Sequence, residues 1–392
     1  MRILLLAASA AALLPLAPRV AAACGGCFGA SVTTVESHRM AVMVSPERSI
    51  LWDQIAYSGS PEDFVWVLPV PSAEVTVELA EPGFFAELDA QTGPIVQPRP
   101  QGVPEPEPCF GCCASEAASL DGEEVPSDEV TVYAESTVGP YETVVIGSEE
   151  AGALQGWLTE HGYPVPESSV PIIDGYVERG SVFVVLRLAP AVDVQAMQPV
   201  RVTYAGALLE FPLAMVTVGA RGELGLTLWV IAEQRYAPQN YATVRVDPDD
   251  LVFDWNTTTS NYDDVFERAM EAAGGRAWVV EHADAFASLM LTATVDTELV
   301  RTAMPAPFIT RLRTRMLVDH LDEDIQLGPA RDADRVDRIL VAGDEIARPW
   351  DDEPEEDEGC HIQRRSSAHV FTIALIAASI AWMMRPRRRR RR

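Results

Sequence analysis

Apolar and polar positions alternate along much of the chain, and this pattern predicts a fold dominated by β-strands. From residue 181 to residue 252, the alternating runs are separated by turn residues at the spacing expected of an antiparallel sheet. The expected strands are Val32–Val44, Ser49–Tyr57, Phe64–Pro71, Val130–Glu135, Thr143–Ile146, Val182–Leu188, Val200–Tyr204, Leu208–Val218, Leu226–Glu233, Ala242–Val246 and Trp278–Val280. Apolar residues at helical spacing predict short helices at Glu81–Ala90, Glu149–His161, Tyr262–Ala273, Thr297–Ala303 and Phe308–Met316.

The two ends of the chain have the patterns of export and membrane segments. Residues 1–23 read as a signal peptide, with a basic start, an apolar stretch and small residues before Cys24. Residues 368–384 are almost wholly apolar and have about the shortest length that can cross a bilayer as a helix. The arginine-rich residues 385–392 that follow would hold this end in the cytoplasm. We therefore expect an α+β fold, mainly antiparallel β-sheet with several short helices, plus one C-terminal transmembrane helix.

The charge of the chain is strongly negative and excludes nucleic acid as a partner. Thirty basic residues, all arginine, stand against 58 acidic residues, for a net charge of −28. Nine of those arginines lie in the leader or after residue 384, where there are no acids, so the rest of the chain is more acidic still. Such a surface repels polyanions and keeps an exported domain soluble.

Between these ends the composition divides the chain into a folded region and a stalk. We expect an exported domain over residues 24–343, interrupted by a proline-rich loop at residues 93–127 that contains three cysteines. An acidic stalk over residues 344–367 carries Cys360 and leads into the apolar segment. Like charges repel each other along such a stalk and keep it extended.

Cysteines are the main candidates for site chemistry. Apart from Cys360 they are Cys24, Cys27, Cys109, Cys112 and Cys113. Export favours disulfides, and an odd number leaves one thiol free, lipidated or intermolecular. The two C-x-x-C spacings also match a four-thiolate zinc site, and the first alone matches a redox dithiol. Each of these interpretations brings the proline-rich loop back to the mature N-terminus. No other cofactor is indicated.

Other chemistry-bearing residues give weaker signals. The six histidines are scattered, and no nucleophile elbow, phosphate-binding loop or dinucleotide fingerprint is present. The acidic run Asp319–Asp324 is either a solvated turn or a cation site, although it lacks the glycine of a calcium loop. Six tryptophans are either core residues or an aromatic face for carbohydrate: Trp52, Trp66, Trp157, Trp229, Trp255 and Trp278.

Five segments in the region from Cys24 to about residue 250 have a distinctive sequence: Cys24–Phe28, Asp63–Pro71, Val138–Tyr141, Leu154–Tyr163 and Tyr176–Leu188. They resemble a bacterial family of exported proteins, domain of unknown function 2330 (DUF2330). The family brings no activity and no catalytic residue with it. Separately, Cys360, the apolar segment and the arginines look like a myxobacterial C-terminal sorting tail (MYXO-CTERM). By this resemblance, Cys360 is the position of processing by a membrane protease and of lipid attachment.

The sequence therefore predicts a protein held at the cell surface or outer envelope, with a non-enzymatic binding or structural role. Its expected partners are the membrane, through the C-terminal helix, a sorting protease and an unidentified component of the envelope. The alternative is an exported metal- or thiol-dependent enzyme that uses the Cys24/Cys27 and Cys109/Cys112 cluster.

Overall fold

Two β-sheets form the centre of the protein. The computed structural model describes residues 27–28, 37–54, 65–99 and 131–347, apart from 163, 164, 166, 194, 195, 219, 221 and 333. In spatial order, the larger sheet contains β14 (Ala242–Val244), β17 (Ala277–Ala285), β18 (Phe308–Leu317), β12 (Glu223–Ala232), β2 (Ser37–Val44), β3 (Arg48–Gln54), β10 (Val200–Ala205) and β5 (Val75–Leu79). The smaller sheet contains β1 (Cys27–Phe28), β4 (Val65–Val70), β9 (Val182–Leu188), β8 (Tyr141–Gly147) and β7 (Thr131–Val138).

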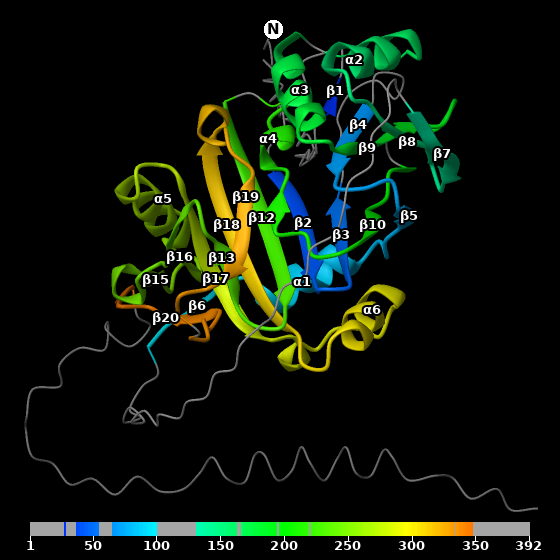
Figure 1. Ribbon diagram of the computed structural model, residues 1–392. Coiled ribbons are helices and arrows are strands. Elements are labelled where there is room, and N and C mark those ends of the chain that lie inside the picture. The colour runs from blue at the N-terminus through cyan, green and yellow to red at the C-terminus, as the bar shows by residue number, and fades with distance from the viewer. Residues whose placement is uncertain are drawn as a thin grey trace, which may run out of the picture. The chain divides into compact units, whose positions relative to one another are not determined.

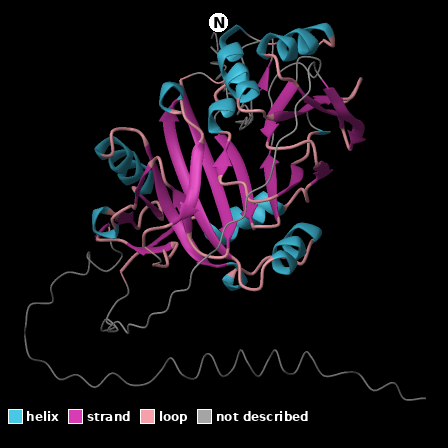
Figure 2. Ribbon diagram, in the orientation of Figure 1, coloured by secondary structure: helices cyan, strands magenta, loops and turns pink. Residues whose placement is uncertain are grey.

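Most neighbouring strands in these sheets run antiparallel, as Figures 1 and 2 show. Every pair in the five-stranded sheet is antiparallel. In the eight-stranded sheet only β12–β2 and β14–β17 are parallel. The predicted α+β fold with mainly antiparallel sheet is therefore confirmed.

Shorter elements surround the two sheets. Three small sheets contain β11 (Glu210–Phe211), β19 (Ile325–Pro329) and β13 (Tyr236–Pro238); β16 (Thr259–Ser260), β15 (Val252–Asp254) and β21 (Asp344–Ile346); and β20 (Ile339–Val341) with β6 (Ile95–Gln97). The described helices are α1 (Phe84–Thr92), α2 (Ala151–Glu160), α3 (Val170–Glu178), α4 (Leu213–Val216), α5 (Tyr262–Ala272) and α6 (Val295–Ala303).

Side-chain alternation distributes the apolar residues over separate cores. On β2, Met40 and Val42 belong to a core shared with the five-stranded sheet, whereas Ala41 and Met43 face a second core with α1 and α6. Successive residues of a strand point to opposite faces, so one strand serves both cores. A third core packs α2 and α3 against the other face of the five-stranded sheet, and Figure 1 shows the two helices together there.

A hairpin of the five-stranded sheet contacts an edge strand of the larger one. The turn between β7 and β8 consists of Gly139 and Pro140, and Gly139 has a φ of 55°. A Cβ atom at Gly139 would lie 2.5 Å from Cδ1 of Leu79 in β5. Only glycine combines this backbone conformation with such a close approach.

Some expected elements are wrong. The predicted helix Phe308–Met316 is strand β18, because Arg311, Arg313 and Arg315 recur every second residue, with Leu312 buried on the opposite face. The predicted strand Leu208–Val218 is instead the short strand β11 followed by helix α4. Pro212 lies between them, and its missing N–H prevents a continuous ladder.

Two further differences are an unexpected helix and a shifted boundary. Helix α3 was not expected from the sequence, although Ile173, Tyr176 and Val177 form its buried face. At the other end, Asp344–Ile346 is strand β21, which pairs with β15, so the folded region extends three residues beyond the expected boundary at 343.

The predicted signal peptide, most of the proline-rich loop, the stalk after Ala347, the apolar segment at 368–384 and the arginine tail lie outside the described residues. Among the residues that the structure does describe, no helix is both long and apolar enough to cross a membrane. The transmembrane helix therefore stays a prediction.

Candidate binding site

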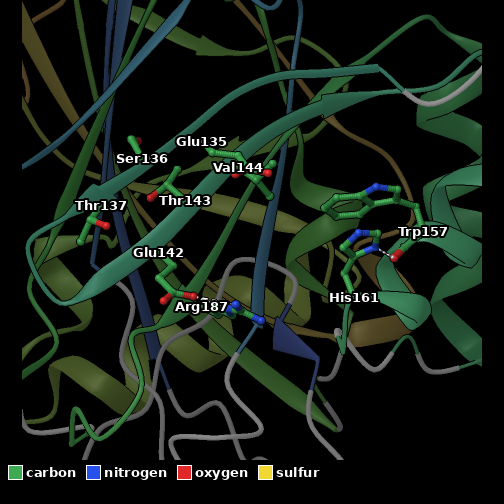
Figure 3. A pocket seen from close by; sticks show the side chains of 9 residues that line it. All are labelled: Glu135, Ser136, Thr137, Glu142, Thr143, Val144, Trp157, His161 and Arg187. Carbon is green, nitrogen blue, oxygen red and sulfur yellow. Dashed lines mark hydrogen bonds and ion pairs between the residues drawn. The ribbon is translucent and has the colours of Figure 1, made fainter.

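A polar pocket lies beside the outer strands of the five-stranded sheet. It has a volume of about 460 Å³, within the usual range of small-ligand pockets. Figure 3 shows its lining, which comes from β7, β8, β9 and the C-terminal end of α2: Glu135, Ser136, Thr137, Glu142, Thr143, Val144, Trp157, His161 and Arg187.

Strand register explains which side chains share the pocket's face. Thr137 lies opposite Glu142, and Glu142 lies opposite Arg187. Residues directly opposite each other in an antiparallel pair project from the same face of the sheet. The same rule places Glu135 beside Val144, on the face that packs against α2. Ser136 and Thr143 lie opposite each other at the positions between these pairs, so they belong to the other face of the sheet.

Glu142 and Arg187 form an ion pair on the sheet side of the pocket. Nε and Nη2 of Arg187 both lie 2.7 Å from Oε2 of Glu142. No partner of Oε1 is found among the described residues. The two side chains are 34% and 41% exposed, so solvent screening limits the pair's contribution to stability to about 1 kcal/mol at most. The ion pair matters more for binding than for stability, because the guanidinium donors of Arg187 and the carboxylate acceptor of Glu142 lie side by side on the partly exposed side of the pocket.

Two stacked rings form the opposite wall. Trp157 lies on α2 and His161 is the C-cap residue of that helix, and their ring centroids lie 4.0 Å apart at an interplanar angle of 17°. His161 Nδ1 lies 2.8 Å from the Trp157 carbonyl oxygen, which can only accept, so Nδ1 carries the hydrogen. Buried Leu154 and Leu158 hold the helix on the sheet. Trp157 is half-buried, and Figure 3 shows both rings on the helix side of the pocket.

The charges of the lining restrict what the pocket can bind. Glu135 and Glu142 outnumber the single guanidinium of Arg187. This excess of carboxylates disfavours an anionic ligand. Hydroxyl groups fit a carboxylate and a guanidinium that lie side by side, because a hydroxyl both donates and accepts hydrogen bonds.

The predicted cysteine cluster stays a prediction. Cys24, Cys109, Cys112, Cys113 and Cys360 lie outside the described residues. The backbone of Cys27 is placed in β1, opposite Trp66 of β4 in the five-stranded sheet. Within the part of the chain that the structure describes, no three histidine, cysteine or acidic side chains are grouped to hold a metal ion.

Acids of the run Asp319–Asp324 have protein partners. Asp322 and Glu323 both pair with Arg276, at 2.9 and 3.2 Å. Asp324 accepts from Arg179, from the Tyr176 hydroxyl and from the backbone N–H of Ala214. Burial and the neighbouring Asp324 raise the pKa of Tyr176, which keeps this hydroxyl protonated as a donor. The run is therefore a charged turn held by arginines, but it is not fully solvated as expected, because the Asp324 side chain is only 5% exposed.

The tryptophans are mostly core residues, as one of the expectations had it. Those with no exposed surface are Trp52, Trp66, Trp229 and Trp278. Trp255 is half-buried and donates its indole N–H to Glu345 at 2.7 Å. Trp157 alone of the six lines the pocket. Sequence reasoning did not identify Glu142 or Arg187, because they are 45 residues apart and carry no motif.

Fold and pocket define an α+β protein built on two β-sheets, with a polar, aromatic-walled pocket at the outer edge of one of them. The chain belongs to the DUF2330 family, described as uncharacterized protein conserved in bacteria, and the family model matches residues 18–328. This confirms the resemblance seen in the sequence and extends it beyond residue 250. Comparison with curated proteins and with solved structures found no match.

Proposed function

We propose that this chain is an exported, surface-held binding protein, and that the pocket of Figure 3 binds a carbohydrate without catalysing a reaction on it. The observation that carries the proposal is the stacked pair Trp157–His161 in the same pocket as the ion pair Glu142–Arg187.

A sugar has the surface chemistry that this pocket complements. The C–H groups of a sugar ring form an apolar face that packs against an aromatic ring, and Trp157 offers such a ring. Sugar hydroxyls both donate and accept, which matches a carboxylate and a guanidinium held side by side. The ion pair is partly exposed, so ligand hydroxyls replace water there without breaking a buried contact.

Export and retention belong to the same proposal. The signal-like residues 1–23, the acidic charge of the folded region and the apolar segment followed by arginines support a location at the cell surface or outer envelope. In this scheme Cys360 is the position where a sorting protease processes the tail. The mature protein would then lack the residues after about Cys360, and a Cys360→Ser variant would stay uncleaved or be mislocalised.

Binding is tested with the full-length chain purified in detergent. The protein is screened on an array of neutral and charged bacterial glycans, and each hit is titrated by calorimetry. We expect at least one neutral glycan to bind and Trp157→Ala to weaken it tenfold or more. Release of reducing ends in the same samples would show hydrolysis and would contradict a purely binding role.

The matched control is Tyr133→Ala. Tyr133 is an exposed aromatic residue on β7 outside the pocket lining, so its removal should leave glycan affinity unchanged. Equal loss in both variants, or no glycan bound by the wild type, would reject the proposal. A charged polyamine that binds more tightly than any glycan would also count against it.

A further inference from the structure

Three arginine side chains among the described residues are less than 10% exposed, and their charges are compensated differently. Arg201, 7% exposed, pairs with Glu78 and Asp296. Arg311, 8% exposed, pairs with Asp89 and Glu281. The third, Arg235, is 4% exposed. Removing a guanidinium from water is costly unless carboxylates and hydrogen bonds compensate its charge. Arg201 and Arg311 meet this requirement with two carboxylates each.

Arg235 has one carboxylate partner within the described part of the chain. Its Nη1 lies 2.6 Å from Oδ1 of Asp332, a side chain that is 55% exposed and also pairs with Arg245 at 3.0 Å. Nη1 additionally donates to the main-chain oxygens of Asp332 and Asp334, at 3.3 and 3.1 Å. Nε is buried and has no acceptor among the described residues. All the hydrogen bonds described for the Arg235 guanidinium are therefore donated by Nη1.

Arg235 also lines a pocket of about 470 Å³, separate from the one in Figure 3. The pocket lies along β13 and the segment after β19, and its lining is Arg235, Ala237, Pro238, Gln239, Tyr241, Ala242, Thr243, Ala330, Arg331 and Asp332. Arg331 is exposed and brings a second positive charge. With two arginines and one aspartate, the lining of this pocket is net positive, whereas the chain as a whole has a net charge of −28.

The directions of the pKa shifts of Arg235 and Arg201 agree with this difference. Burial lowers the pKa of Arg235 and outweighs the opposing effect of Asp332 and, more weakly, Asp334, while the positive charge of Arg245 adds to the lowering. Burial acts on Arg201 in the same direction, but Glu78 and Asp296 outweigh it and the pKa of Arg201 is raised. The Arg235 site is therefore short of negative charge relative to its counterpart.

We infer that this second pocket binds a small oxyanion, a carboxylate or a phosphate, whose oxygens supply the negative charge that Arg235 lacks. Guanidinium groups recognise both anions through parallel N–H donors, and Arg331 at the rim adds attraction. This pocket shares no lining residue with the proposed carbohydrate pocket, so the two proposals can be tested separately.

The test uses the full-length chain and two probes, sodium succinate and inorganic phosphate. Melting temperature is followed by differential scanning fluorimetry against sodium chloride at matched ionic strength, and affinity by calorimetry. We expect a saturable rise in melting temperature with at least one probe. A stronger effect of succinate would identify a carboxylate ligand, and a stronger effect of phosphate would identify a phosphate ligand.

Two variants with the same charge change separate a site from a general salt effect. Arg331→Glu reverses a charge in the pocket lining, is exposed and should fold, and we expect it to weaken probe binding at least tenfold. Arg335→Glu makes the same change at a residue that is 73% exposed and pairs with Asp284 outside this lining, and it should bind like the wild type. Equal responses in both variants, or no response beyond that to chloride, would overturn the inference.

Discussion

The hydroxyl of Tyr141 donates to the carbonyl oxygen of Gln198 and accepts from the N–H of the same residue, at 2.8 and 2.9 Å. Tyr141 begins β8 in the five-stranded sheet, and Gln198 lies two residues before β10 of the larger sheet. This two-way contact therefore ties the hairpin at the edge of the candidate pocket to the larger sheet. Burial raises the pKa of Tyr141, so the hydroxyl stays protonated and able to donate.

Replacing Tyr141 by phenylalanine should remove both contacts while keeping the ring in the core. The tyrosine side chain is fully buried and both hydrogen bonds are partly buried, so the polar groups of Gln198 would lose a partner that water replaces only in part. We expect the free energy of unfolding in urea to fall by about 1–3 kcal/mol. The matched control, Tyr133→Phe, changes an exposed tyrosine on the neighbouring strand and should have almost no effect. Equal stability of the two variants would show that the Gln198 contact contributes nothing.

Buried and exposed ion pairs should differ sharply in their contributions to stability. Asp296 has no exposed surface and accepts from Arg201, the Trp52 indole and the backbone N–H of Glu81. Asp296→Asn would leave Arg201 undercompensated in the core, and we expect a loss of about 3–5 kcal/mol in chemical denaturation.

The comparison for Asp296 is an ion pair on the same helix. Arg301 and Glu298 are 36% and 53% exposed, and Arg301→Ala should cost about 1 kcal/mol or less because solvent screens that pair. A loss of similar size in the two variants would contradict the distinction between buried and exposed charges. Loss of glycan binding is not expected in either, because neither residue lines the pocket.

A buried histidine should make the fold sensitive to mild acid. Burial lowers the pKa of His282, with Arg338 acting in the same direction and Asp284 and Asp337 opposing it. In unfolded chains histidine has a pKa of about 6.5, so below that pH the unfolded chain binds a proton that the folded chain does not. The free energy of unfolding should therefore fall as the pH is lowered through 6.5, by up to about 1.4 kcal/mol per pH unit from this residue.

His282→Gln removes that proton uptake and should flatten the pH dependence. The two proteins are compared by urea denaturation from pH 8 to pH 5, with the difference at pH 8 as the baseline. Below pH 6.5 the free energy of unfolding should fall faster for the wild type than for the variant, so the difference between the two proteins should shift steadily in favour of the variant. Parallel curves over this range would mean that His282 does not contribute to acid sensitivity.

Much of the fold could be predicted from local pattern, and the errors have physical causes. Strands such as Val182–Leu188 were correctly bounded because they are continuous apolar runs between turn residues. Strand β18 was mistaken for a helix because the spacing of its apolar residues also fits a short helix. In the fold, Arg311 is buried against Asp89 and Glu281, partners that come from other elements and cannot be seen from local spacing.

The candidate pocket was only partly predictable for a related reason. Trp157 could be noted from the sequence as an aromatic residue on an expected helix. Its place beside Glu142 and Arg187 depends on strand register and on the packing of α2 against the sheet. Likewise, the missing second carboxylate of Arg235 emerges only when all buried arginines are compared in three dimensions.

The cysteine prediction can be tested by counting thiols and metal together. Cys360→Ser in the full-length chain leaves Cys24, Cys27, Cys109, Cys112 and Cys113. If the exported protein forms two disulfides, the denatured variant should show about one reactive thiol and no bound metal, and reduction should raise the count to five. A four-thiolate zinc site would instead give one zinc ion per chain, and chelation of that metal would expose four more thiols without a reductant. Stoichiometric zinc would therefore reject the disulfide prediction.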